Sequence, residues 1–233
     1  RQKGIARELP SIFLCRRSNR SLRKNKSSNL PLKGAQLKKE YPSPDMRFLT
    51  DLDILCQKEQ QGKIQEIMES LGYTLEHGGG HHDVYVRNPF MTVEIHWDCS
   101  TENQELDVLL EDIWSKCIRK EGFAFAYQMP WEEYYVYMIG HMAKHLKYGG
   151  IGIRMLLDLF VFAQKKRDSC DWKKIEACLE QGGTFEVFRN DAALFTAMYG
   201  GRRIVFLREI FFWNISLAVA HTARWKIIWE RDS

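Results

Sequence analysis

The chain has 233 residues, of which 45% are apolar and 12% aromatic, so it can bury a sizeable core and is not an intrinsically disordered protein. Its net charge of +4 is unevenly spread, because residues 1–28 hold nine Lys and Arg against one acid and residues 29–233 hold 25 against 29, or −4. The body is therefore mildly acidic; only residues 1–28 have a charge suited to nucleic acid or anionic lipid, and we expect them to form a disordered, solvated basic segment.

The six cysteines contain no Cys-x-x-Cys pair and no small-scaffold spacing, a pattern typical of reduced thiols in an intracellular protein. The apolar stretch over residues 11–15 is too short for a signal peptide, and the longest late apolar run, residues 211–220, is half the length of a membrane span. We therefore expect a cytoplasmic protein with no membrane partner and no disulfide framework.

The first ordered element is expected near residue 30. Residues 30–35 form a short apolar run that breaks at Gly34, and residues 35–40 predict a helix that ends before Pro42. A Lys33-Gly34 pair at a strand-to-helix turn can place a cation and free backbone N–H groups at a helix N-terminus, where phosphate binds well. The turn is not a P-loop, because no Gly-Lys-Ser/Thr follows a glycine-rich loop.

Residues 48–55 are an apolar, strand-like run that contains two carboxylates two positions apart. Side chains alternate along a strand, so Asp51 and Asp53 are expected on one face and Leu52 and Ile54 on the other. Two carboxylates this close repel each other unless a cation lies between them, and hard oxygen ligands suit Mg²⁺. We interpret the pair as a metal site; the alternative is an edge strand whose outer face is acidic.

A helix and a hairpin follow. Apolar residues at i, i+3, i+4 and i+7 predict an amphipathic helix over residues 64–71 that ends at Gly72. Residues 77–83 predict a flexible loop, whose three histidines are an alternative, adventitious metal site. Residues 84–87 and 91–97 alternate as the strands of a hairpin. Glu94 and His96 share one face of the second strand, so a third carboxylate stands on a strand that can neighbour the Asp strand.

From residue 103 the periodicity is helical. An apolar stripe over residues 106–117 predicts one helix, Pro130 begins a second that the glycines of residues 149–152 end, and a third runs over residues 153–166. Asp171 is a good N-cap for a fourth helix and Thr184 for a fifth. The chain is therefore expected to divide into an α/β part (29–102), a helical part (103–199) and an atypical tail (200–233).

The second of these helices carries two histidines at a metal-binding spacing. His141 and His145 are four residues apart and can bind zinc, but the His-Glu-x-x-His pattern of a metalloprotease needs Glu at position 142, where the chain has Met. One alternative is that both histidines pack in an inter-helix contact. The other is a substrate-facing role, in which Lys144 and Arg154 offer cations to a nucleotide and Asp158 orients Arg154.

Several of these motifs, taken in order, resemble the DNA polymerase β-like nucleotidyltransferase superfamily. They are Lys33-Gly34, Tyr41-Pro42-Ser43-Pro44, Arg47, Asp51-Leu52-Asp53 and Val93-Glu94-Ile95-His96-Trp97. Residues 141–145, 149–154 and 156–159 are similar to the helical half of a bacterial group of nucleotidyltransferases. The resemblance covers about residues 30–185 and implies an α+β fold, with a small mixed β-sheet nucleotidyltransferase core followed by a helical portion.

The resemblance also implies a site. In that superfamily a glycine motif holds the triphosphate, an Asp-x-Asp pair binds metal, and a third acid on a neighbouring strand completes the site. It therefore assigns Asp51, Asp53 and Glu94 as catalytic residues and metal ligands, with Mg²⁺ or Mn²⁺ as the cofactor. The substrate-binding candidates are Lys33, Gly34, Arg47, His96, His141, Lys144, His145 and Arg154. The chain departs from the family at Ala35, where a serine or second glycine is usual, and Lys33 is expected to compensate.

The activity implied is transfer of a nucleoside monophosphate from a nucleoside triphosphate to an acceptor, by positioning and charge neutralisation. The sequence leaves open the base and the acceptor, which can be a small molecule, a peptide or RNA. Two alternatives also stay open: a metal-dependent phosphohydrolase that uses the same carboxylates, and a non-catalytic nucleotide-binding module.

Overall fold

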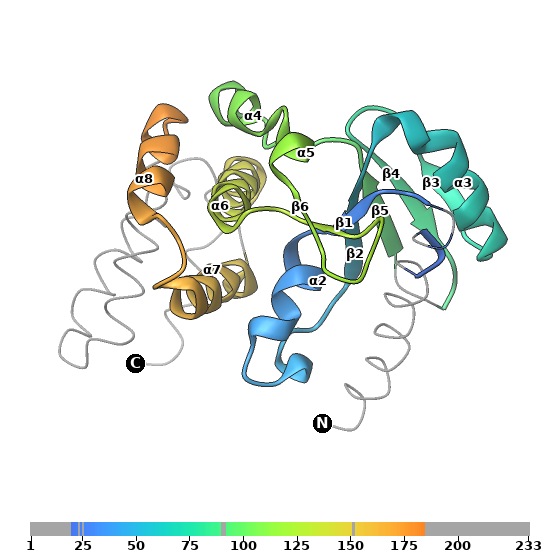
Figure 1. Cartoon of the computed structure of the whole chain (residues 1–233), viewed down its shortest axis with the longest axis horizontal. Coiled ribbons are helices and arrows are strands. Elements are labelled where there is room, and N and C mark those ends of the chain that lie inside the picture. The colour runs from blue at the N-terminus through green and yellow to red at the C-terminus, as the bar shows by residue number, and fades with distance from the viewer. Residues whose placement is uncertain (1–19, 23, 25, 90–91, 151, 185–233) are drawn as a thin grey trace, which may run out of the picture.

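The computed structural model describes residues 20–22, 24, 26–89, 92–150 and 152–184 (Figure 1). Within these ranges the chain forms a five-stranded mixed sheet in the order β1-β2-β5-β4-β3. The strands are β1 (Asn29–Pro31), β2 (Asp51–Cys56), β3 (Thr74–His77), β4 (His82–Val86) and β5 (Thr92–His96). The sheet pairs antiparallel throughout except between β2 and β5, which are parallel.

Helices follow and flank this sheet. They are α2 (Lys33–Leu37), α3 (Gln61–Ser70), α4 (Gln104–Leu110), α5 (Ile113–Lys116), α6 (Trp131–Tyr148), α7 (Ile153–Lys166) and α8 (Trp172–Gln181), with 3₁₀ turns at Lys38–Glu40, Pro44–Met46 and Lys58–Gln60. A small ribbon of β6 (Ile118–Arg119) and β7 (Tyr127–Gln128) precedes α6. The predicted α+β class, a mixed sheet followed by a helical portion, is confirmed.

The two faces of the sheet belong to different hydrophobic clusters. Leu52 and Ile54 of β2 pack with α3, whereas Leu55, on the other face of the same strand, packs with residues of α6 and α7. Figure 1 accordingly shows α3 on one side of the sheet and α6, α7 and α8 on the other. Asp51 and Asp53 alternate with Leu52 and Ile54, so the acidic face is the one turned towards the helical portion.

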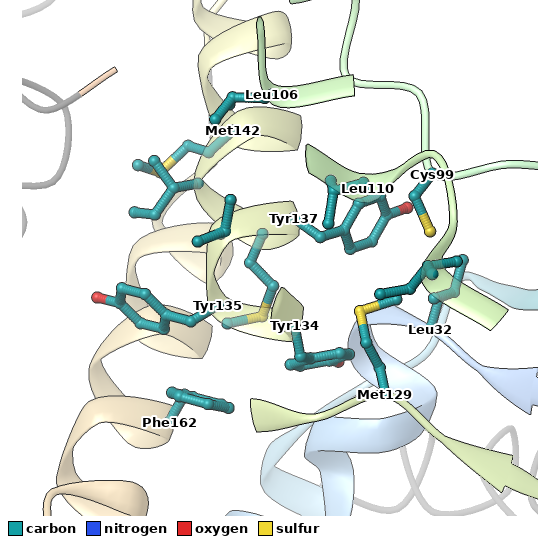
Figure 2. Close-up of a cluster of buried hydrophobic side chains, with 14 of the residues drawn as sticks. Leu32, Cys99, Leu106, Leu110, Met129, Tyr134, Tyr135, Tyr137, Met142 and Phe162 are labelled. Carbon is teal, nitrogen blue, oxygen red and sulfur yellow. The ribbon is translucent and has the colours of Figure 1, made fainter. Parts of the chain in front are cut away.

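The cluster on the helical side contains a group of packed aromatic side chains among leucines and methionines (Figure 2). Tyr134, Tyr135 and Tyr137 of α6 are almost completely buried, and Phe162 of α7 contacts the first two of them with ring centroids 5.9 and 5.1 Å apart. These large side chains lie within about one turn of α6 and pack it against α7 and into the cluster that also contains Leu55 of β2. This packing fixes the side of α6 that is turned to the acidic strand face.

Some elements differ from expectation. The stripe over residues 106–117 forms two short helices, α4 and α5, which separate at Glu111 and Asp112. The predicted N-cap roles of Asp171 and Thr184 differ in outcome: the Asp171 side chain accepts a hydrogen bond from the backbone N–H of Lys174, whereas any helix after Thr184 lies outside the described residues. β3, β6 and β7 were not predicted, because they are short and β3 is exposed along its length.

The expected disorder of residues 1–28 is wrong for the last of them. Leu22 is fully buried in the cluster that contains α3, and Ser27 and Ser28 are buried beside β1. Residues 1–19 and the tail 200–233 lie outside the described residues. None of the described helices is both long and apolar enough to cross a membrane.

A buried ion pair links the segment before β2 to the helical portion. The Arg47 guanidinium donates from Nε to Oδ1 of Asp158 at 2.7 Å and from Nη2 to Oδ2 at 2.8 Å, and the Tyr41 hydroxyl donates to Oδ1 at 2.6 Å. Both charged side chains are about nine-tenths buried. Arg47 is thus the partner of Asp158, and the expectation that Asp158 orients Arg154 is wrong. Arg154 instead lies 3.5 Å from the Phe48 carbonyl oxygen.

Asp158→Asn is expected to lower the free energy of unfolding by about 3 kcal/mol, because it leaves the buried Arg47 charge without its counter-charge. Urea denaturation of the full chain measures the change. Glu102→Gln is the control, since Glu102 forms an ion pair with Lys144 at the surface and its loss is not expected to move the midpoint. Equal midpoints for the two variants would contradict a structural role for the Arg47–Asp158 pair.

Candidate active site

The parallel pairing of β2 with β5 brings the predicted acids together. Asp53 is in register with Glu94, and Leu55 with His96. Residues in register on neighbouring strands project from the same face, so Asp51, Asp53, Glu94 and His96 share the face turned to α6. The predicted convergence of strand acids on one side of the sheet therefore matches the observed register.

Asp53 is the centre of this group. Its side chain is 5% exposed, and its Oδ1 lies 2.7 Å from Nζ of Lys33 and 3.0 Å from Nε2 of His96. The same Nε2 lies 3.4 Å from Oε2 of Glu94. Asp53, Glu94 and His96 each offer one atom that could ligate a metal ion, and these three atoms all lie within 4.8 Å of one another. We call these three residues the Asp53 cluster.

Lys33 reaches Asp53 from an unusual backbone conformation. It has φ of 44°, in the left-handed region that side chains other than glycine rarely adopt. Hydrogen bonds hold the backbone there: the Leu32 N–H donates to the Asp53 carbonyl at 3.0 Å, and the Tyr134 hydroxyl donates to the Lys33 carbonyl at 2.8 Å. Strained residues of this kind are frequent at functional sites, where the surrounding structure holds them. Here α6 and β2 together aim the ammonium group at the acid.

Charge compensation sets the protonation of the cluster. Burial raises the pKa of the Asp53 carboxyl, but the His96 hydrogen bond and the Lys33 charge outweigh it and hold that pKa below its usual value. Burial lowers the pKa of His96, and the hydrogen bonds to Asp53 and Glu94 more than reverse this, so the net pKa is raised. Asp51 behaves oppositely to Asp53: burial, then Asp53 and Glu94, raise its pKa. The charge of the Asp53 carboxylate is thus compensated by Lys33 and His96. The charge of Asp51 is destabilised by burial and by the two neighbouring acids, so a cation bound nearby would stabilise it.

The histidines of α6 face the same space. Burial, the Lys33 charge and His145 lower the pKa of His141 to about 2, and burial followed by Lys33 lowers that of His145. The two rings have centroids 4.6 Å apart. Both imidazoles are therefore neutral at physiological pH and can each donate and accept one hydrogen bond. Neither belongs to a group of three metal-ligating side chains among the described residues.

The other predicted substrate-binding residues lie further from Asp53 or are engaged elsewhere. Lys144 Nζ is 2.8 Å from Oε1 of Glu102. Arg47 is directed to Asp158, as described above. Gly34 lies under it, since a Cβ at position 34 would be 2.6 Å from Nη2 of Arg47. A larger residue at this position would therefore force the Arg47 guanidinium away from its place beside Asp158.

Two contributors were not predicted from the sequence. His82 stacks on His96 with ring centroids 5.3 Å apart and an interplanar angle of 26°, and Tyr134 holds the Lys33 backbone. The register of the hairpin pairs His82 with His96, so a correct prediction of that register would have identified His82. No sequence signal marks Tyr134, because its role depends on where α6 lies relative to β1.

The Asp53 cluster fits a divalent cation. It offers two carboxylates and one imidazole at nearly the spacing of ligands around one ion, with Asp53 buried at its base. The neighbouring cationic groups show that this place already stabilises positive charge. Asp51, on the same strand face, adds a further carboxylate outside the cluster.

The family described as "Uncharacterised nucleotidyltransferase" matches residues 6–200, and so includes most of the basic segment 1–28. Among solved structures, the chain is similar to the one titled "Solution Structure of Antibiotic-Resistance Factor ANT(2'')-Ia Reveals Substrate-Regulated Conformation Dynamics", with 10% identity and a TM-score of 0.54 over 81% of this chain and 96% of that one. At this identity the similarity shows a shared fold. No curated protein matches the chain. Because the family match spans most of its length, the chain belongs to the family of uncharacterised nucleotidyltransferases.

Proposed function

We propose that the chain is a metal-dependent nucleotidyltransferase, which moves a nucleoside monophosphate from a nucleoside triphosphate to a hydroxyl of an acceptor. The observation that carries the proposal is the register of Asp53 with Glu94 on two parallel strands, on the sheet face turned to the helical portion. Family membership supports the same reaction class. Mg²⁺ or Mn²⁺ is the proposed cofactor, and it would be held by Asp53 and Glu94 with Asp51 beside them.

The charges of the site suit a triphosphate. When bound, a divalent cation would neutralise phosphate charge and lower the pKa of the attacking hydroxyl. The residues of the chain contribute by positioning the reacting groups. Glu94 is the most exposed member of the Asp53 cluster, and we assign it to accept the proton of the acceptor hydroxyl. In-line displacement of pyrophosphate needs little further covalent chemistry from the protein.

The ion pair between Lys33 and Asp53 suggests a role for Lys33 in triphosphate binding. Its ammonium group is 2.7 Å from the carboxylate that would also bind the cation, so the two positive charges compete for one place. A triphosphate entering the site offers Lys33 other oxygens. We assign Lys33 to the triphosphate, and regard its contact with Asp53 as the resting arrangement.

Further polar groups line the helical side. Neutral His141 and His145 can donate hydrogen bonds to phosphate or sugar oxygens without adding charge. Lys144 and Arg154 are proposed to add cations at the opening of the site, Lys144 after release from Glu102. Gly34 and Arg47 are proposed to act on the triphosphate through the Lys33 turn that they support, rather than by facing it. The acceptor, whether a small molecule, a peptide or RNA, is to be found by screening.

Asp53→Asn is expected to reduce transfer of the α-phosphate label from an NTP to the acceptor by at least about 100-fold, because it removes a charged ligand at the base of the cluster. Asp83→Asn is the matched control. Asp83 is as buried as Asp53 but lies on the opposite face of the sheet, where it accepts hydrogen bonds from Gln61 and Gly79.

The radiolabel also separates the alternatives. Water as the acceptor would release the α-label as nucleoside monophosphate, or the γ-label as inorganic phosphate, and would indicate a phosphohydrolase. Binding without release or transfer of either label would indicate a nucleotide-binding module. Unchanged transfer by the folded Asp53→Asn protein would rule out the assigned site.

Lys33→Met is expected to weaken nucleoside triphosphate binding by about tenfold and to strengthen Mg²⁺ binding in the absence of nucleotide by a similar factor, because one positive charge leaves the surroundings of Asp53. Titration calorimetry measures both. Lys63→Met, on α3 across the sheet, is the control and should change neither. Weaker binding of both ligands by Lys33→Met would show that Lys33 maintains the site and does not compete with the cation.

A further inference from the structure

We propose that His96 is itself a metal ligand, through Nε2, so that the site holds its divalent cation with two carboxylates and one imidazole and prefers Mn²⁺ to Mg²⁺. The inference rests on the proposed function for the presence of a cation, and replaces the expected ligand set of Asp51, Asp53 and Glu94 by Asp53, Glu94 and His96.

The geometry of the three donors carries the inference. Two ligands on one ion are at most about 4.4 Å apart, twice a bond of about 2.2 Å. The donor atoms of the Asp53 cluster are all within 4.8 Å of one another, so small side-chain rotations suffice to place an ion among them. Asp51 is outside this set, and its Oδ1 accepts a hydrogen bond from the Thr50 hydroxyl at 3.3 Å.

The orientation of the imidazole favours the same conclusion. His96 turns Nε2 to both carboxylates at 3.0 and 3.4 Å. In the metal-free site Nε2 carries the proton of this hydrogen bond, and binding of the cation through Nε2 would release that proton to solvent. The ring is only 12% exposed on its side chain, and it is stacked on His82. A ring held in this way by packing presents its nitrogen in a fixed direction, which is what ligation by histidine requires.

The donor set decides the kind of ion. Mg²⁺ is hard and favours oxygen ligands and water, whereas affinity for sites containing nitrogen rises along the first transition row from Mn²⁺. An imidazole among the ligands therefore adds more to the binding of Mn²⁺ than to that of Mg²⁺. The cluster is expected to select between the two ions by this one nitrogen.

The competing explanation makes the opposite prediction. If His96 only balances the charge of Asp53, as an ion pair, then the imidazole and the metal compete for the same carboxylate. Removing His96 would then leave Mn²⁺ binding unchanged or make it tighter. If His96 is a ligand, removing it weakens Mn²⁺ binding. The sign of the change distinguishes the two.

The test uses the full chain with MnCl₂ as the probe. Pulsed electron paramagnetic resonance of bound Mn²⁺ is expected to show coupling to a histidine ¹⁴N nucleus in the wild type and to lose it in His96→Gln. Titration is expected to show at least about tenfold weaker Mn²⁺ binding in that variant, with a smaller change for MgCl₂. His81→Gln is the matched control, because His81 is an exposed histidine of the same hairpin that pairs with Asp98 and gives no atom to the cluster, and this variant should keep both the nitrogen coupling and the Mn²⁺ affinity.

Three results would overturn the inference: no nitrogen coupling of bound Mn²⁺ in the wild type, coupling that persists in His96→Gln, or Mn²⁺ affinity that stays equal or rises in that variant. The wild-type spectrum needs no substitution, so the test stands even if His96→Gln folds poorly. Transfer of the α-label with Mg²⁺ is assayed in parallel. Transfer without nitrogen coupling overturns the ligand role alone, and nitrogen coupling without transfer overturns the proposed reaction alone.

Discussion

The site depends on the burial of one negative charge. Asp53 is 4% exposed, and a carboxylate taken out of water is strongly destabilising unless cations and hydrogen bonds compensate it. Lys33 and His96 supply that compensation from two different elements, the start of α2 and the strand β5. The hydrogen bond from Tyr134 to the Lys33 backbone extends the dependence to α6. The α/β part and the helical portion thus meet around a single carboxylate.

The strand that carries Asp53 serves two purposes along one face. Leu55 packs in the hydrophobic cluster on the helical side, whereas Asp51 and Asp53, on the same face of the strand, contribute carboxylates to the candidate site. Helix α6 lies on this side of the sheet, and its sequence changes along its length, from tyrosines near its start to His141 and His145 near its end. The hydrophobic packing of the first half of α6 therefore places the polar second half next to the acids.

Much of this arrangement was predictable from local pattern. Alternation placed Asp51 with Asp53 and Glu94 with His96, and the turn signals between them gave the order of strand, helix and hairpin. The parallel register of Asp53 with Glu94 was not predictable, because it depends on how the crossover through α3 returns to the sheet. Ion pairs between distant segments were equally hidden: Arg47 and Asp158 are 111 positions apart, and the four-residue spacing of Arg154 and Asp158 suggested the wrong pair. Local spacing indicates which residues can meet on one helix, but long-range packing decides which of them do.

The glycine beneath Arg47 has a consequence for how relatives of this chain are to be read. A methyl group at position 34 would displace the guanidinium and the Leu49 side chain from their observed positions, so a glycine favours the Arg47–Asp158 pair whether or not a phosphate ever approaches. A homologue that had lost all nucleotide binding but kept this arginine pair would still gain from a glycine at this position. In sequence surveys of the family, the lysine before that glycine is consequently the better marker of the proposed site, since Lys33 contacts Asp53 and Gly34 is not among the contacts of that carboxylate.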